Sequence, residues 1–356
     1  MSRKINLIVI LCSAFFTGNA MDDEAVQSFK PFSSNLYHVF SADLKYGMNE
    51  KNECVKLGFP DDEVVAKLPK NTMYLGGAFS PNSLLFAYTD NSSEKSVVKI
   101  IDIEKRKELF QATICNNPRN MDPKFLDDEW LVTKSFYEIE DSEDKKSSYC
   151  VLLNIKDEFY SKIPLKDISL LHELLGANIQ KQELYLQNSN HFQVLDFFGV
   201  LKRKFKIKDA HWLSFNWILA PDSTKISCQY RSMVNLFSMN KGEKIGKLEH
   251  KASVSNHAWS PDSNYLVSGT DMQEGDVYVW DATAGDLLHK HNLNAWSHLH
   301  GGLPVSKVAW HQNNLIMADG MGRWYQGDVK KIFDLIEKAK NKKQLMEKTT
   351  NEQNKN

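Results

Sequence analysis

A short turn motif recurs along the chain at intervals of 39 to 54 residues, each time between short runs of β-branched and aromatic residues. An apolar residue comes directly before every turn, at positions 40, 79, 125, 179, 219, 259 and 310. The clearest copies are Phe79-Ser80-Pro81-Asn82-Ser83, Leu219-Ala220-Pro221-Asp222-Ser223 and Trp259-Ser260-Pro261-Asp262-Ser263. A period of this length is typical of repeat architectures. The chain therefore consists of seven similar units.

Each unit has room for about four short strands, which favours an all-β, seven-bladed β-propeller of four-stranded antiparallel blades. Strands such as Val97–Ile101 and Val277–Trp280 are rich in β-branched residues and exclude helical repeats. The last unit lacks an outer strand, and we expect the N-terminal segment Ala25–Phe29 to supply it and remove an exposed sheet edge. Apolar residues at 332, 335, 336 and 339 predict a short amphipathic C-terminal helix.

The sixth unit carries the most specific pattern. His250, Val254, Ala258–Asp262, Leu266–Gly269 and Val277–Asp281 follow one another in the order found in WD-repeat proteins, and Trp280-Asp281 is the pair that names that family. From Tyr37 to Asp328 the chain resembles this family, closely in one unit and loosely in six. The resemblance implies a buried hydrogen-bond chain through His250, Ser268, an aspartate of the turn and Trp280. That aspartate is Asp276 or Asp271.

The N-terminus has the layout of a secretory signal peptide. Arg3 and Lys4 precede the apolar run Ile5–Phe16, and the small-residue segment Gly18-Asn19-Ala20 follows. The run is shorter than the roughly 20 residues of a spanning helix, although an uncleaved anchor is an alternative. We expect residues 1–20 to be a signal peptide, 21–329 the propeller, and 330–356 the helix and a disordered tail. The mature chain would be periplasmic or secreted, with no membrane span.

Charge and cysteine content exclude other classes. Lys and Arg number 44 and Asp and Glu number 45, a net charge of −1, which argues against bulk electrostatic binding to nucleic acid or to an anionic membrane. Five cysteines are too few for a disulfide scaffold. An exported setting permits disulfides, and Cys115 and Cys150, in neighbouring units, are the most plausible pair. Cys54 and Cys228 are expected to be buried hydrophobic side chains.

The longest insertions are expected on one face of the ring. In an antiparallel blade, second-to-third turns share a face with the links between blades, and the insertions Glu138–Ser147, Leu165–Leu175 and His291–Leu303 all fall in these places. The second insertion also has the apolar spacing of a short helix. Extra loop length is often functional, so we expect binding on this face.

The third insertion contains Trp296, His298 and His300, the candidate interaction loop. The His-x-His spacing suits a metal ion, but a closed site would need further ligands. Structural or solvated histidines, and a partner contact through Trp296, are the other interpretations.

Catalytic signatures are nearly absent. The sequence has no Gly-x-Ser-x-Gly elbow, no His-Glu-x-x-His motif and no phosphate-binding loop. We therefore expect a monomeric, non-enzymatic scaffold that binds a protein partner and needs no cofactor or metal. One alternative is a propeller enzyme of the hydrolase or lactonase type, with a metal in or near the central channel. Another is a component of envelope assembly.

Overall fold

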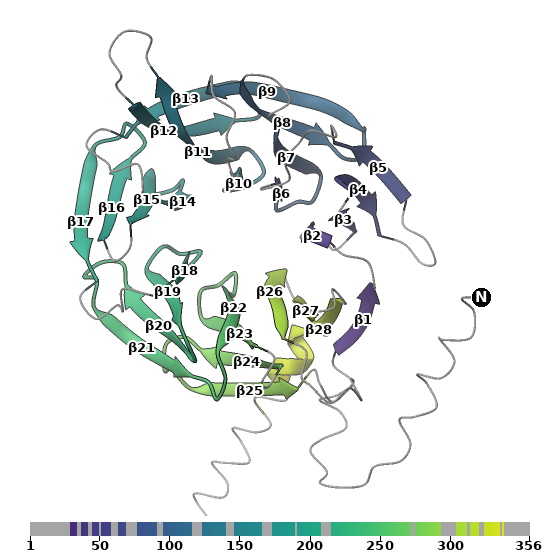
Figure 1. The fold of residues 1–356 in the computed structure, drawn as a ribbon, viewed down its shortest axis with the longest axis vertical. Helices are drawn as coiled ribbons and strands as arrows, with labels where there is room; N and C mark the ends of the chain where they lie inside the picture. Colours follow the sequence, from purple (N-terminus) through teal and green to yellow (C-terminus); the bar gives the residue numbers. More distant parts are fainter. Residues whose placement is uncertain are drawn as a thin grey trace, which may run out of the picture.

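Seven four-stranded antiparallel sheets form a ring around a central axis (Figure 1). The structure is a computed structural model that describes residues 29–33, 37–41, 45–49, 51–57, 63–68, 77–90, 95–115, 123–139, 146–165, 173–188, 191–207, 215–271, 275–292, 304–311, 314–319, 324–334 and 337. Both the expected blade number and the antiparallel four-stranded blades are confirmed.

The blades are numbered in chain order. The strands of each blade are given from the innermost to the outermost. The first four blades are β2 (Tyr37–Phe40), β3 (Tyr46–Asn49), β4 (Glu53–Lys56) and β5 (Glu63–Lys67); β6 (Gly77–Phe79), β7 (Leu85–Asp90), β8 (Ser96–Asp102) and β9 (Lys107–Cys115); β10 (Lys124–Phe125), β11 (Trp130–Ile139), β12 (Lys146–Asn154) and β13 (Phe159–Pro164); and β14 (Glu173–Asn178), β15 (Glu183–Asn188), β16 (His191–Asp196) and β17 (Leu201–Lys206). The last three are β18 (Phe215–Leu219), β19 (Lys225–Tyr230), β20 (Met233–Ser238) and β21 (Lys244–Glu249); β22 (Val254–Trp259), β23 (Tyr265–Thr270), β24 (Asp276–Asp281) and β25 (Leu287–Asn292); and β26 (Val305–His311), β27 (Asn314–Asp319), β28 (Trp324–Asp328) and β1 (Phe29–Ser33).

The recurring turn follows the innermost strand of each blade, so the repeat period predicted the blade boundaries. In blade six, the Ser260 hydroxyl accepts a hydrogen bond from the backbone N–H of Tyr265 at 2.9 Å, which closes the turn. Ser80 accepts from Leu85 in the same way in blade two. The fourth turn residue takes a positive φ, 61° at Ser263 and 65° at Ser83, and short polar residues tolerate such turn geometry better than β-branched ones.

The N-terminal strand closes the ring, but it lies further along the chain than the sequence predicted. β1 pairs antiparallel with β28, with Phe29 opposite Gly327 and Pro31 opposite Tyr325. The closing strand is thus Phe29–Ser33, and residues 25–28 of the predicted strand lie outside the described part of the chain. Pro31 lies within this strand. Proline is tolerated because β1 is the outermost strand of its blade, where one row of backbone groups has no partner strand.

The hydrophobic core is divided into seven clusters, one between every two neighbouring blades. Alternation along each strand produces this arrangement, because successive side chains of a strand point to opposite faces of the sheet. In β15, Leu184 and Leu186 pack toward blade three, whereas Tyr185 between them packs toward blade five. Each blade is therefore buried on both faces, and no blade has a core of its own.

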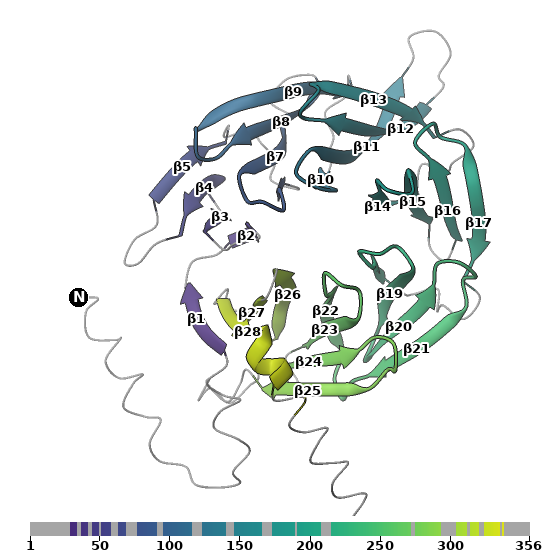
Figure 2. The same ribbon diagram turned by 180° about the vertical axis from the view of Figure 1, so that it is seen from behind.

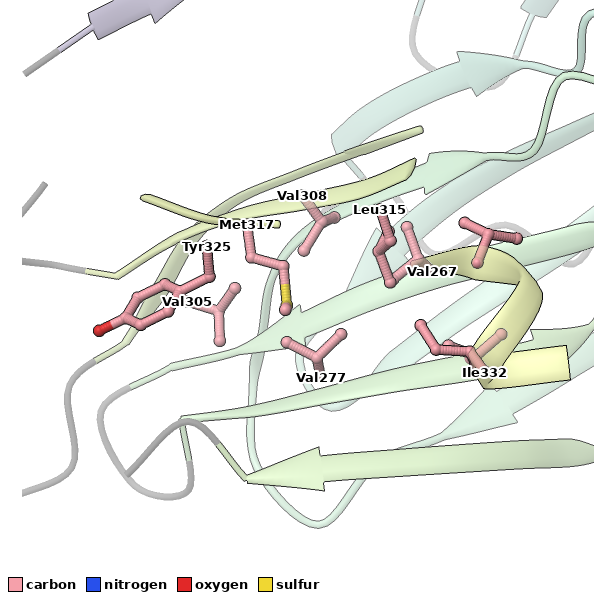
Figure 3. Packing of buried hydrophobic residues seen from close by; sticks show 10 residues of the cluster. Val267, Val277, Val305, Val308, Leu315, Met317, Tyr325 and Ile332 are labelled. Atoms are coloured by element: carbon pink, nitrogen blue, oxygen red, sulfur yellow. The ribbon is translucent and has the colours of Figure 1, made fainter. Parts of the chain in front are cut away.

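The short C-terminal helix, residues 329–334, docks on the ring. Its first turn is capped by Asp328, whose Oδ1 accepts the backbone N–H of Lys330 at 2.9 Å. Ile332 is buried in the cluster between blades six and seven, together with Val267 and Val277 (Figure 3). The Phe333 ring lies 4.5 Å from that of Tyr265. Figure 2 shows the helix beside β28 and β24.

The link between blades three and four does not form the expected helix at its C-terminal end. Residues 173–175 belong to β14, so the short helix expected over Leu165–Leu175 is wrong for that part, and 166–172 lie outside the described residues.

Within the described residues, no helix is long and apolar enough to cross a membrane. Residues 1–20, the expected signal peptide, are not among them.

Candidate binding face

The strand order places the three insertions on one face of the ring. Residues 140–145 connect β11 to β12, 166–172 connect β13 to β14, and 293–303 connect β25 to β26. The first is a second-to-third connection and the other two are links between blades, and in antiparallel blades both kinds leave the ring on the same side. We call this side the insertion face. The β11–β12 hairpin is longer than expected, since Glu138 still pairs with Ser147. Trp296, His298 and His300 all fall in 293–303, outside the described residues.

The opposite face is fastened by hydrogen bonds between the recurring turns of neighbouring blades. The backbone N–H of Asp222 in blade five donates to the Ser263 hydroxyl of blade six at 3.0 Å. Asn178 of blade four donates through Nδ2 to Ser223 of blade five at 3.3 Å. The C-terminal helix also begins on this side, directly after a third strand. We call this side of the ring the turn face. Because its turns are hydrogen-bonded to one another, loop length varies on the insertion face instead.

In blade six, three of the predicted hydrogen-bond residues meet. Nε2 of His250 lies 2.6 Å from the Ser268 hydroxyl oxygen, and Nε1 of Trp280 donates to the same oxygen at 2.9 Å. Nδ1 of His250 lies 3.3 Å from the carbonyl oxygen of Ser232, which can only accept. The proton therefore sits on Nδ1, and Nε2 accepts from Ser268. All three side chains are buried, and together they join the link before β22 to the second and third strands of blade six.

Asp276 lies at the start of β24, and its carboxylate forms an ion pair with Lys290 on the neighbouring strand β25. Its backbone N–H donates to the Thr270 hydroxyl at 2.9 Å. These contacts fasten the second-to-third turn and the outermost strand of the blade. A link from His250 to Asp276 or Asp271 stays a prediction.

A second buried histidine was missed by the sequence analysis. His257 on β22 contacts blade five, where the Ser227 hydroxyl lies 2.9 Å from Nε2 and Gln229 Oε1 lies 3.3 Å from Nδ1. Because the amide oxygen only accepts, Nδ1 carries the proton and Ser227 donates to Nε2. Burial, followed by the nearby His250, lowers the pKa of His257 to about 3. Ser227 and His257 are both fully enclosed, so this Ser–His pair joins two blades and cannot meet a substrate.

His289 and His291 on β25, just before the third insertion, have the same His-x-His spacing as His298 and His300. The rings of His289 and His291 are stacked with centroids 6.5 Å apart. Burial lowers the pKa of both side chains, that of His291 to about 4 with a contribution from His289. Nowhere in the described ranges do three or more His, Cys, Asp or Glu side chains come together in a group that could hold a metal ion. The two neutral histidines are part of the packing of the outer strand.

Cys54 and Cys228 are buried, as the sequence predicted. Cys54 is buried between blades one and two and Cys228 between blades four and five, and burial raises the pKa of the Cys54 thiol to about 12. Cys150 is buried between blades three and four. The Cys115 side chain is not described, so its bridge to Cys150 stays a prediction.

A scan against models of protein families finds no match for this chain, and neither does a search of the curated proteins. Among solved structures, the fold is similar to the crystal structure of the β-propeller domain of Cps50 (Swd1) from Myceliophteria thermophila. The TM-score is 0.56 and the sequence identity 11%, and the match covers 83% of this chain and 98% of that domain. At this identity the likeness shows the fold alone, which is that of a β-propeller.

Proposed function

We propose that this protein is an exported, non-enzymatic interaction scaffold, a divergent member of the WD-repeat family that binds a protein partner through the insertion face. The observation that carries the proposal is the contrast between the two faces. Turns on one side are hydrogen-bonded from blade to blade, while every connection of eight or more residues between strands is a link between blades and leaves the other side. Long loops on a rigid scaffold are a common arrangement for recognition.

Within this proposal, Trp296 is the anchor of the contact. Tryptophan is enriched among the residues that dominate binding energy, and the two histidines beside it supply polar contacts. The loop that contains them leaves the ring next to β25 and β26, two strands whose packing between blades six and seven holds its ends in place.

Export is supported by the arrangement of the N-terminus. Cleavage after Ala20 removes Arg3 and Lys4 and leaves 42 basic against 45 acidic residues, a net charge of −3. The closing strand begins only at Phe29. The cleaved chain therefore keeps every strand of the ring.

The test is affinity purification of the mature chain, residues 21–356, from its native compartment. Wild type is compared with Trp296→Ala and with Phe159→Ala, a matched control in which an exposed aromatic residue beside a third-to-fourth turn is removed. We expect one stoichiometric protein partner that is retained by Phe159→Ala and lost with Trp296→Ala. Equal retention by both variants would place the contact elsewhere. Stoichiometric metal that disappears in a His298→Ala/His300→Ala variant would instead support the enzymatic alternative.

A further inference from the structure

The turn between β16 and β17 presents an apolar tip to solvent. Phe198 is 80% exposed, Val200 61% and Leu201 51%. The outermost strands of blades one, two, five and six each carry one exposed large apolar residue near their start, at 38% to 47% exposure: Val64, Leu109, Ile245 and Leu287. That of blade three carries two, Phe159 at 54% and Tyr160 at 40%. Single exposed residues of that kind are ordinary, whereas a contiguous apolar tip marks an interaction site.

The tip is held rigidly. Oδ1 of Asp196 accepts the backbone N–H groups of Phe198 at 2.9 Å and Val200 at 2.8 Å. Gly199 takes a φ of +82°, and a side-chain carbon there would lie 2.8 Å from the carbonyl oxygen of Pro164 on blade three. The turn that carries Phe198 is therefore held in one conformation against blade three, and this conformation exposes the Phe198 side chain.

The strand that follows the tip is basic. β17 reads Leu-Lys-Arg-Lys-Phe-Lys, with four cations in six residues and no acid. Glu183 forms ion pairs with Lys202 and Arg203, at 3.6 and 3.3 Å. Lys204 and Lys206 are exposed, and neither forms an ion pair with a carboxylate of the described residues.

Strand pairing places Lys204 and Lys206 on the same face of the sheet as Leu201, where β17 leaves the tip. Leu201 lies opposite Leu195, Lys204 opposite Gln193 and Lys206 opposite His191. Residues 191, 193 and 195 alternate along β16, so Leu201, Lys204 and Lys206 share one face of the sheet. Because β17 is the outermost strand, this face lies at the outer rim of the ring (Figure 1). We call Phe198, Val200, Leu201, Lys204 and Lys206 the blade-four rim patch.

We propose that the blade-four rim patch docks the propeller on an anionic lipid surface, with the apolar tip in the headgroup region and the lysines beside the lipid charges. Apolar side chains flanked by lysines are the composition of interfacial membrane contacts. A protruding tip needs no shaped partner, whereas a protein would need a pocket for Phe198. Lysines along an edge strand also oppose pairing with a strand of another protein. The apolar tip belongs to a third-to-fourth turn and so lies on the turn face, away from the insertion face, and the proposal therefore goes beyond the scaffold function.

Attraction to the membrane must be local, because the mature chain carries a net charge of −3. It should therefore be sensitive to salt, since surface charges are screened beyond roughly 3 Å at about 1 M salt and beyond roughly 10 Å at about 0.1 M. Each lysine near an anionic membrane contributes about fivefold to partitioning, and so the pair contributes about 25-fold.

The experiment is co-sedimentation of the mature chain with vesicles of phosphatidylcholine alone or of phosphatidylcholine and phosphatidylglycerol in a ratio of 3:1. We expect binding to the anionic vesicles at low salt and loss of binding at high salt. Lys204→Glu/Lys206→Glu should lower partitioning by about 25-fold or more. Phe198→Ser should lower it by about tenfold, because a large apolar side chain no longer leaves water.

Matched controls lie on blades five and six. Lys244→Glu reverses an exposed cation of β21, and Leu287→Ser removes an exposed apolar residue of β25. Both should bind vesicles like the wild type, and thermal unfolding should show that all variants are folded. A folded wild type that leaves the anionic vesicles in the supernatant at low salt overturns the proposal. Equal losses in the rim-patch variants and the controls overturn it too.

Discussion

The Ser268 hydroxyl lies 2.6 Å from Nε2 of His250 and couples the link before β22 to the second strand of blade six. Trp280 donates to the same hydroxyl from the third strand. The His250 ring also meets the Trp280 ring edge-on, with centroids 5.0 Å apart. One buried oxygen thus ties three segments of the blade together.

Replacing His250 by Ala should lower the free energy of unfolding by about 1 to 3 kcal/mol, because the Ser268 hydroxyl loses a partner in a buried site. Chemical denaturation measures the change. Lys251→Ala, an exposed neighbour, is the control and should stay within about 0.5 kcal/mol of wild type. If His250→Ala is as stable as Lys251→Ala, the buried chain does not stabilise the blade.

Acid should destabilise the ring through His257. Its pKa is about 3 in the folded protein against an ordinary value of 6.5, so between these two values the unfolded chain binds more protons. Stability is therefore complete above about pH 6.5 and falls as the pH drops toward 3, with a contribution of about 1 kcal/mol per pH unit from this group. Unfolding by urea at a series of pH values measures the slope.

His257→Gln should reduce that slope, since the titrating group is gone. Ser227→Ala is the matched control, because it removes a hydrogen-bond partner of the same ring and leaves the histidine in place. It should be less stable at every pH with the slope kept. A slope unchanged in His257→Gln would mean that the acid sensitivity has another origin.

The C-terminal helix should contribute to the stability of blades six and seven. Ile332 is almost fully buried, and its replacement by Ala should lower the free energy of unfolding by about 2 kcal/mol through lost burial and a residual cavity. Lys331→Ala, on the exposed side of the same helix, should change it by less than about 0.5 kcal/mol. Equal effects of the two substitutions would show that the helix does not dock in solution.

Ring closure should depend on β1. A chain that begins at Asn35 lacks the strand and leaves the edge of β28 unpaired, whereas a chain that begins at Met21 keeps it. The shorter chain should lose at least about 5 kcal/mol, more than a typical single core substitution. Calorimetry and size-exclusion chromatography would compare them. Identical unfolding of the two chains would contradict closure by β1.

The sequence predicted the blades well because their turns are locally encoded. A proline followed by Asp or Asn and then Ser favours a tight turn in three blades, and the apolar residue before the turn marks the end of an inner strand, as Trp259 does in β22. The predicted closing strand shares only Phe29 with the observed one, and the pairing of β1 at the ring's outer edge makes Pro31 acceptable there.

Contacts between blades could not be predicted from local pattern. Ser227 and Gln229 lie 30 and 28 residues before His257 and meet it only when two blades pack together. The available signal was that Ser227 and Gln229 alternate with the apolar residues Ile226 and Cys228 in one strand. The rim patch was missed for a similar reason, because Leu201 and the lysines of β17 read as an ordinary edge strand until the exposure of the turn is known.

The central claim is that partner binding occurs on the insertion face, and hydrogen–deuterium exchange of the purified complex tests it most directly. The account predicts slower exchange in the complex for residues 293–303, and for 140–145 or 166–172 beside them, with no change at the turns 80–83, 220–223 and 260–263. Protection of those turns, with the three connections exchanging as in the free protein, would contradict it.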